Sequence, residues 1–293
     1  MEAIPPGGSA TPAGPAALVV QSSGKTPTSK GGSWGAPTVF FGTSELVLVA
    51  HPDDEALGCS ALLQRAQSPA VIFATDGAPA VERFWAAYGS RQAYAEVRRQ
   101  EAKLASRAAG NTKIFFLSDV AGNSFVDQEL FKNLMAAMAA LRGPAGALGT
   151  SAILTHAYEG GHPDHDACSF LGHALGKDLM LPVWEMPLYH RDQEGVMRRQ
   201  QFLCGSVEEF ELQPTGEELE RKRRMFDEYK SQHHAIRDFP LAPERFRPQP
   251  TYDYCRPPHP KTLNYEAWGW PMTGEQVSAA FGAYMRGGEA LSA

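Results

Sequence analysis

The chain has 293 residues, enough for one large domain or two small ones. Its hydrophobic fraction of 43% and charged fraction of 20% are typical of a globular protein, and its net charge of −6 offers no basic face for nucleic acid. The absence of an apolar run of about 18 residues argues against an integral membrane segment. The four cysteines form no CxxC pair, so we expect free thiols and a cytoplasmic protein in a reducing compartment.

The first 43 residues differ in composition from the rest of the chain. They are rich in Gly, Pro, Ser, Thr and Ala, and they lack the basic start and apolar core of a signal peptide. We therefore predict a disordered N-terminal extension over residues 1–43, followed by a single domain over residues 44–293.

From Glu45 onward, apolar strand-like runs alternate with amphipathic helical segments. The pattern predicts strands over 45–50, 70–75, 113–117, 152–155 and 181–188, with helices over 55–67, 92–109, 128–141 and 164–175. Strands separated by helices of this length form parallel βαβ units. The predicted fold class is therefore α/β and Rossmann-like, a mostly parallel sheet with helices on both faces.

The rhythm changes after Tyr189. Residues 202–212 are predicted to form an antiparallel pair that turns at Gly205, and residues 216–232 a charged helix. A Pro- and aromatic-rich segment over 233–271 is predicted to be a long surface loop, with a short helix over 274–285.

Two polar clusters follow strands of the predicted sheet. His51-Pro52-Asp53-Asp54-Glu55 comes directly after the first strand, and His162-Pro163-Asp164-His165 follows the strand over 152–155. Ligands of open α/β sheets bind at the C-terminal ends of the strands. The two clusters together predict a divalent-metal site built from two strand ends.

The residue types suit catalytic zinc. Such sites use three protein ligands from His and Asp and keep one position open for water or substrate, and the metal lowers the pKa of bound water to about 7. Two histidines and one carboxylate would bind the metal, leaving one carboxylate as a base and one histidine to stabilise an oxyanion. Spacing alone does not decide between Asp53 and Asp54, or between His162 and His165.

The HPDDE segment, the Thr75-Asp76-Gly77 that ends the next strand, and the later HPDH resemble the PIG-L/LmbE-like family of zinc-dependent N-acetyl-sugar deacetylases. The resemblance extends from about Glu45 to Gln232, where Tyr229-Lys230-Ser231-Gln232 resembles the Tyr-x-Ser-Gln end of a family helix. It implies a Rossmann-like fold and a metal-dependent N-deacetylase.

The resemblance also implies roles for single residues. His51, Asp54 and His165 resemble the zinc ligands, and Asp53 resembles the general base, and later acid, that serves the metal-bound water.

Three further residues match the family pattern. His162 resembles the residue that stabilises the tetrahedral intermediate, with Asp164 tuning its charge, and Arg98 resembles a helix arginine that contacts substrate.

The implied substrate is an N-acetylglucosamine-type sugar or glycoconjugate, with zinc as the cofactor and Fe²⁺ as an alternative for the same ligands. The sequence does not decide whether the protein forms a homo-oligomer. A metal-dependent amidase acting on a thiol conjugate or another amide is the first alternative. A non-catalytic Rossmann-like binding module is the second, although no glycine-rich dinucleotide motif occurs.

Each of these residues also has a structural interpretation. The Asp53-Asp54 pair and Asp164 could cap helices, and Arg98 could pair with Glu101 on a solvated face. The basic run 221–224 is interpreted as a solvated helix face. His156, Glu159 and Asp166 are candidate spare ligands. Aromatic residues that could line the site are Trp85, Tyr88, Tyr158, Trp184, Tyr252, Tyr254, Trp268 and Trp270.

Overall fold

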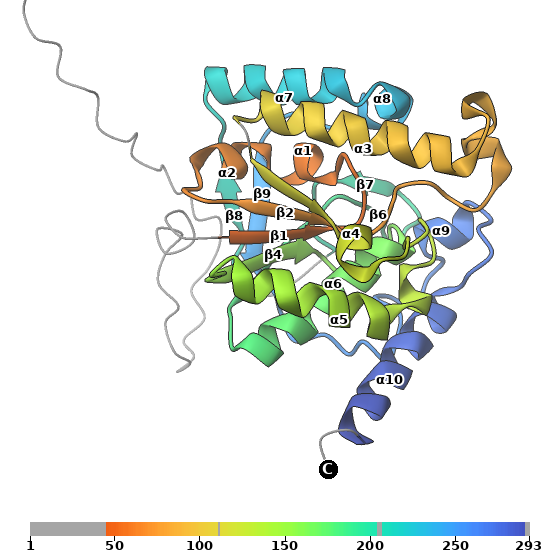
Figure 1. Cartoon of the computed structure of the whole chain (residues 1–293). Helices are drawn as coiled ribbons and strands as arrows, with labels where there is room; N and C mark the ends of the chain where they lie inside the picture. The colour runs from red at the N-terminus through yellow and green to blue at the C-terminus, as the bar shows by residue number, and fades with distance from the viewer. Residues whose placement is uncertain (1–44, 111, 204–206, 291–293) are drawn as a thin grey trace, which may run out of the picture.

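The computed structural model describes residues 45–110, 112–203 and 207–290, so the predicted N-terminal extension lies outside the described residues. A seven-stranded sheet with the order β3-β2-β1-β4-β5-β9-β8 forms the centre of the molecule (Figure 1). Its parallel strands are β1 (Glu45–Val49), β2 (Ala70–Phe73), β3 (Lys113–Phe116), β4 (Ala152–His156) and β5 (Val183–Met186). The strands β8 (Phe210–Leu212) and β9 (Glu244–Pro248) extend the sheet in the antiparallel sense.

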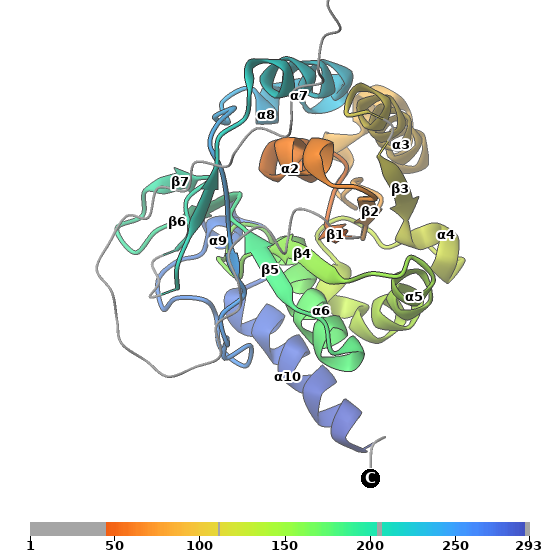
Figure 2. The same ribbon diagram turned by 90° about the vertical axis from the view of Figure 1, so that its left-hand side faces the viewer.

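Helices cover both faces of the sheet, as Figures 1 and 2 show. One face carries α1 (Asp54–Gly58), α2 (Ser60–Arg65), α3 (Arg91–Ala108) and α7 (Gly216–Glu228). The other carries α5 (Leu134–Ala147) and α6 (Pro163–Leu179), with α10 (Gly274–Ala290) packed against α6. The α/β, Rossmann-like fold class is thereby confirmed.

Strand β1 lies in the interior of the sheet and has apolar side chains on both of its faces. Leu46 and Leu48 belong to the core on the α5 and α6 side, whereas Val47 and Val49 belong to the core on the α1 and α2 side. All four are fully buried. Side chains alternate between the faces of a strand, so a run of apolar residues predicts this double burial.

The predicted helix over 55–67 is two helices, broken at Cys59. The carboxylate of Glu244, from β9, accepts the N–H groups of Ala61 and Leu62 in the first turn of α2. Lys222, from α7, donates to the carbonyl of Leu57 in α1 and to Glu244. Groups distant in sequence thus satisfy the helix ends that the break leaves open.

Lys222 is also the exception in the basic run 221–224. Arg223 and Arg224 are exposed as predicted and Arg221 is half-buried, but Lys222 is fully buried.

The predicted helix over 128–141 begins later, at Leu134. It follows a short 3₁₀ turn at Leu130–Lys132, because the carboxylate of Asp164 binds the N–H groups of Gln128 and Leu130 and shapes this segment. A five-residue helix that the sequence pattern did not indicate, α4 (Leu117–Ala121), follows β3.

The prediction for the C-terminal part was wrong in two places. Strand β8, which was expected to pair within residues 202–212, pairs with β9. The hairpin in this part joins β6 (Tyr189–Arg191) to β7 (Met197–Arg199), and the expected turn residue Gly205 lies outside the described residues. The long loop predicted over 233–271 contains β9, α8 (His233–Ile236) and α9 (Asn264–Ala267).

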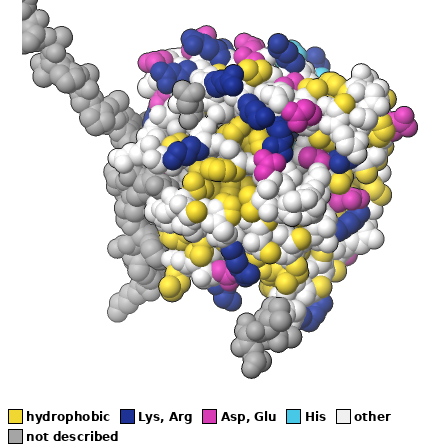
Figure 3. All heavy atoms as spheres, in the orientation of Figure 1, with side chains coloured by type: hydrophobic (Ala, Val, Ile, Leu, Met, Phe, Trp, Pro, Cys, Tyr) yellow, Lys and Arg dark blue, Asp and Glu magenta, His cyan; other side chains and the backbone are white. Residues whose placement is uncertain are grey.

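Strand β3 forms one edge of the sheet and leaves Ile114 and Phe115 half-buried. Figure 3 shows hydrophobic side chains gathered on this face, with charged side chains around them. The guanidinium of Arg99 lies 3.9 Å from the centre of the Phe116 ring, and Lys113 on the strand is exposed. Charged residues at an edge strand oppose pairing with another chain.

Cys59 and Cys168 are buried free thiols, whereas the free thiol of Cys255 is exposed. Within the part of the chain that the structure describes, none of the helices is long and apolar enough to cross a membrane.

Candidate metal centre

The two predicted clusters meet at one edge of the sheet. Strands β1 and β4 are adjacent and parallel, so the residues after them emerge side by side. His51 follows β1, whereas His162 and His165 lie at the start of α6, behind β4. The ring centres of His51 and His165 are 5.3 Å apart, and those of His51 and His162 are 4.4 Å apart.

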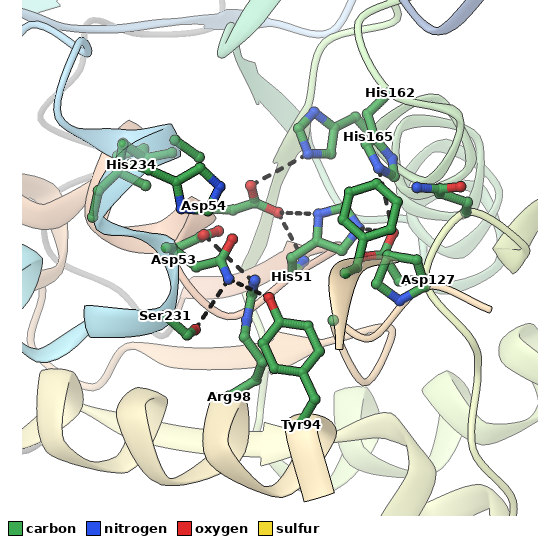
Figure 4. Close-up of a pocket in the computed structure, with 18 of the residues that line it drawn as sticks. His51, Asp53, Asp54, Tyr94, Arg98, Asp127, His162, His165, Ser231 and His234 are labelled. Carbon is green, nitrogen blue, oxygen red and sulfur yellow. Dashed lines mark hydrogen bonds and ion pairs between the residues drawn. The ribbon is translucent and has the colours of Figure 1, made fainter. Parts of the chain in front are cut away.

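The three predicted metal ligands face one another. Asp54 places Oδ1 at 3.2 Å from Nε2 of His165 and Oδ2 at 3.4 Å from Nδ1 of His51 (Figure 4). All three side chains are buried, and neither ring nitrogen of His165 has a hydrogen-bond partner. The short Asp54–His165 contact is therefore a close approach of two ligand atoms without hydrogen-bond geometry. Two imidazoles and a carboxylate with unused lone pairs fit the donor set that zinc uses.

The spare ligands suggested by the sequence have structural partners instead. His156 lies 3.3 Å from Asp54, but the same Nε2 accepts the N–H of Ala50. Glu159 accepts the N–H groups of Leu188 and Tyr189, which fixes the turn into β6.

Asp166 shapes the loop before α6. Its Oδ1 accepts the N–H groups of Glu159 and Gly160, two residues of that loop.

Asp53 has an unusual backbone, with φ 130° and ψ −25°. A non-glycine residue in such a region costs about 1–3 kcal/mol and is found most often at functional sites. Asp53 occupies the N-cap position of α1 but makes no capping hydrogen bond, so the helix-cap interpretation does not describe it. Its carboxylate instead lies 3.4 Å from Nη2 of Arg98 and lines a cavity.

The adjacent carboxylates differ in charge state because their surroundings differ. Burial raises the pKa of Asp53 to about 8, although Arg98 opposes this. Burial also disfavours the charge on Asp54, but His165 and His156 beside it hold its pKa well below the usual range. The surroundings thus move the pKa values of the two neighbouring carboxyls in opposite directions.

His162 and Asp164 lie next to this cluster. Nδ1 of His162 accepts the backbone N–H of Asp164 and caps α6. The carboxylate of Asp164 lies 3.3 Å from Nε2 of His51 and also binds the loop before α5. The structure thus brings the predicted residues together, with the Asp164 carboxylate bonded to the ring of His51.

Asp127 was missed from the sequence. Its Oδ1 lies 3.2 Å from Nε2 of His51 and 3.3 Å from Nε2 of His162, and it is buried without a hydrogen-bond partner. Burial disfavours the charged form of His51, yet the nearby Asp127 raises the pKa of His51 well above its usual value. Asp127 lies in a loop between α4 and α5 that carries none of the recognised motifs, so no sequence signal identified it.

Arg98 is buried, so the interpretation as a solvated charge paired with Glu101 is wrong. Its Nη2 donates to the carbonyl of Pro52 at 2.6 Å, at the base of the first cluster. Glu101 instead accepts the backbone N–H and the hydroxyl of Ser231.

The Tyr229–Gln232 segment contacts the same region. Tyr229 donates to Glu55, and Gln232 donates to the hydroxyl of Tyr94. In Figure 4, Tyr94 and Arg98 project from α3 toward Asp53.

A cavity of about 450 Å³ opens in front of these groups. Its floor includes the metal-ligand candidates, Asp53, Asp127 and His162, and its apolar walls include Phe84, Tyr88, Tyr189, Phe239, Trp268 and Trp270. Of the aromatic residues singled out in the sequence, Tyr88, Trp268 and Trp270 line the cavity.

The other aromatic candidates do not line it. Tyr158, Tyr252 and Tyr254 pack against one another, with Tyr158 and Tyr254 also contacting Phe281. Trp184 packs against Phe210, and Trp85 lies outside the lining.

The sequence of residues 46–175 matches the family model described as PIG-L: GlcNAc-PI de-N-acetylase. This segment is a PIG-L family region. It contains both clusters and every predicted site residue, so the expected resemblance is confirmed over these residues. No curated protein sequence matches the chain.

Solved structures share the fold. A triple mutant of the deacetylase Orf2 of teicoplanin biosynthesis is 20% identical, with a TM-score of 0.54, over 70% of this chain and 97% of that chain. The zinc-inhibited form of teicoplanin deacetylase Orf2 is 18% identical, with a TM-score of 0.53, over 70% and 97% of the two chains. The A40926 pseudoaglycone deacetylase Dbv21 is 19% identical, with a TM-score of 0.51, over 70% and 96%. At these identities the likeness establishes the common fold.

Proposed function

We propose that this protein is a metal-dependent N-deacetylase that hydrolyses the acetamide of an N-acetylated sugar or glycoconjugate. One observation carries the proposal. Two histidines and a carboxylate from two distant segments converge at the floor of a cavity, beside a second carboxylate whose residue, Asp53, has a strained backbone. Metal ligands beside a free base are the combination that amide hydrolysis needs.

His51, Asp54 and His165 would hold the metal, with zinc as the first choice and Fe²⁺ as the alternative for the same donors. Bound zinc would polarise the amide carbonyl and lower the pKa of water. Asp54 is the ligand favoured by geometry because its two oxygens face both imidazoles, whereas Asp53 faces Arg98.

Asp53 would act as the base and then as the acid. It would take a proton from the attacking water and return it to the sugar nitrogen as the C–N bond breaks, so that acetamide and water give acetate and a free amine. A pKa raised to about 8 by burial suits a group that accepts a proton and then releases it.

His162 and Arg98 complete the floor of the cavity. His162 would donate a hydrogen bond to the oxyanion that develops on the acetyl oxygen, and the nearby Asp127 would orient its ring. Arg98 would hold Asp53 in place and, because it lines the cavity, would also contact the substrate.

The acetylated-sugar substrate is supported by the family model, which is described as a GlcNAc-PI de-N-acetylase, and by deacetylases among the proteins of similar fold. The aromatic walls suit a pyranose ring, because the apolar face of a sugar stacks on such rings.

The test is acetate release from a panel of N-acetylated sugars and one acetylated thiol conjugate, with bound metal measured in the same preparation. We expect release from a sugar, loss on chelation, and recovery with zinc or Fe²⁺. Asp53→Asn should keep the metal and lower kcat by about 10²- to 10⁴-fold. Asp119→Asn is the matched control, since it also removes a carboxylate bound to an arginine, on the exposed surface. Undiminished turnover by Asp53→Asn would end the proposal for the base.

A further inference from the structure

The strained backbone conformation of Asp53 must be stabilised by contacts with other residues. Its φ of 130° lies in the region that L side chains rarely adopt, and its neighbour Asp54 already begins α1. A strained residue persists only where surrounding contacts fix it. Those contacts identify the groups on which the orientation of the Asp53 carboxylate depends.

The backbone N–H of Asp53 donates to the carboxylate of Glu55. The distance from the nitrogen to Oε2 is 3.1 Å, and the Glu55 side chain is buried. Glu55 thus reaches back from the first turn of α1 to the residue that precedes the helix. This hydrogen bond forms while Asp53 is in its strained conformation, and it therefore helps to stabilise that conformation.

The other oxygen of Glu55 accepts the hydroxyl of Tyr229, which is fully buried. Tyr229 ends α7, and its backbone N–H binds the carbonyl of Phe226. The same helix is joined to α1 by the bond from Lys222 to Leu57. The carboxylate of Glu55 is therefore fixed by a residue that has little freedom to move.

Arg98 fixes Asp53 from the other side. It donates to the carbonyl of Pro52 and approaches the Asp53 carboxylate. The side chain and the backbone of Asp53 thus have separate restraints, one from α3 and one from Glu55 and α7. The function of Tyr229, the first residue of the Tyr-x-Ser-Gln segment, follows from this arrangement.

We propose that Glu55 and Tyr229 are positioning residues, which hold the backbone of Asp53 so that its carboxylate faces the cavity. The inference rests on the proposed function, in which Asp53 transfers the proton. Neither residue touches the substrate, so their loss should lower kcat and leave KM nearly unchanged.

The variants are Glu55→Ala, Glu55→Gln and Tyr229→Phe. We expect kcat to fall about 10- to 100-fold in Glu55→Ala, with the bound metal at the wild-type level. Glu55→Gln should recover much of the rate, because its amide oxygen can accept the Asp53 N–H while its amide nitrogen donates to the Tyr229 hydroxyl. Tyr229→Phe keeps the aromatic packing and removes one bond. Combined with Glu55→Ala it should add nothing, since both act through one chain of contacts.

Tyr252→Phe is the matched control. Tyr252 also donates to a buried glutamate, Glu185, at 2.7 Å, but that glutamate pairs with Arg247 rather than with the backbone of Asp53. The control should lose stability as Tyr229→Phe does and keep its kcat. An equal fall in kcat in both tyrosine variants would overturn the positioning role, as would a wild-type kcat in Glu55→Ala.

A crystal structure of Glu55→Ala separates this inference from the proposed function. We expect φ of Asp53 to become negative and its carboxylate to leave Arg98. If wild-type protein releases no acetate from any substrate, the proposed function fails, and this structure still decides whether Glu55 sets the backbone. An unchanged Asp53 would overturn the inference even in an active enzyme. Should Glu55→Ala not fold, the crystal structure and kcat of Tyr229→Phe decide in its place.

Discussion

Asp127 joins the two halves of the polar cluster. A single carboxylate oxygen lies within 3.3 Å of both His51 and His162, and it has no hydrogen-bond partner of its own. A carboxylate in this position can orient both rings. The polar cluster therefore depends on a residue outside both motifs.

Replacing Asp127 tests that dependence. Asp127→Asn should lower metal affinity or kcat by about 10- to 100-fold, because both imidazoles lose a charged neighbour while the shape is kept. Metal content and acetate release measure the two effects. Asp76→Asn is the control, since Asp76 is also a loop carboxylate but binds Arg91 and Ser124 rather than the histidines. A wild-type metal content and rate in Asp127→Asn would show that the contact is dispensable.

The sequence predicted the residues of the site that lie in motifs, and it missed those that do not. His51, Asp54 and His165 follow strands that the apolar pattern identifies, so their meeting at the C-terminal edge of a parallel sheet could be expected. Asp127 arrives through a loop whose path is set by the Asp164 carboxylate. Such a long-range contact has no local pattern.

At the level of elements, the loop before α6 depends on close backbone packing. A Cβ at Gly161 would lie 1.8 Å from the carbonyl oxygen of Tyr189, the first residue of β6. Gly161 also precedes His162, so any shift that makes room would move the second cluster. The glycine is needed for this approach of two backbones.

Gly161→Ala should destabilise the protein by about 1–3 kcal/mol, the usual cost of overpacking, and should lower acetate release. Gly146→Ala is the matched control because Gly146 is exposed in α5 and a Cβ there meets nothing within 4 Å. That control should gain about 0.5–1 kcal/mol. The free energies of unfolding come from urea titration, and a Gly161→Ala protein as stable as wild type would contradict the packing.

Elements with clean apolar patterning were predicted well, and elements with buried charges were not. Strands β1, β2 and β4 are uniformly apolar or nearly so and were found near the predicted bounds. Strand β9 has the sequence Glu-Arg-Phe-Arg-Pro and was assigned to a loop. Its Arg247 is buried because it pairs with Glu185 on the neighbouring β5, at 2.7 Å. Lys222 was misjudged for the same reason, since its partner Glu244 lies on β9.

For the molecule as a whole, the cavity is lined both by the PIG-L family region and by residues that follow it in the chain. Residues 46–175 provide the polar floor, whereas Tyr189, Phe239, Trp268 and Trp270 in the walls lie beyond them. Loops on a rigid scaffold commonly set substrate choice, so we expect these wall residues to select the substrate.

A metal bound only by the folded chain should stabilise the whole molecule. At a free metal concentration about 100 times the Kd, the gain is about 2.7 kcal/mol, which corresponds to a rise in Tm of roughly 5–10 °C. Thermal unfolding with chelator and with zinc measures it. His165→Ala should abolish the difference between the two conditions, and Asp119→Asn should keep it. A chelator that leaves the wild-type Tm unchanged would contradict a ligand set that forms only on folding.

The hydrogen bonds and the ion pair of Glu244 affect the order in which the nascent chain can fold. Glu244 accepts hydrogen bonds from the first turn of α2 and pairs with Lys222, which donates to the end of α1. Glu244 is nevertheless synthesised almost two hundred residues after the HPDDE segment. The outer edge of β5 has no partner until β9 emerges. The contacts that close the break between α1 and α2 can therefore form only after the ribosome has made the chain to about Pro248.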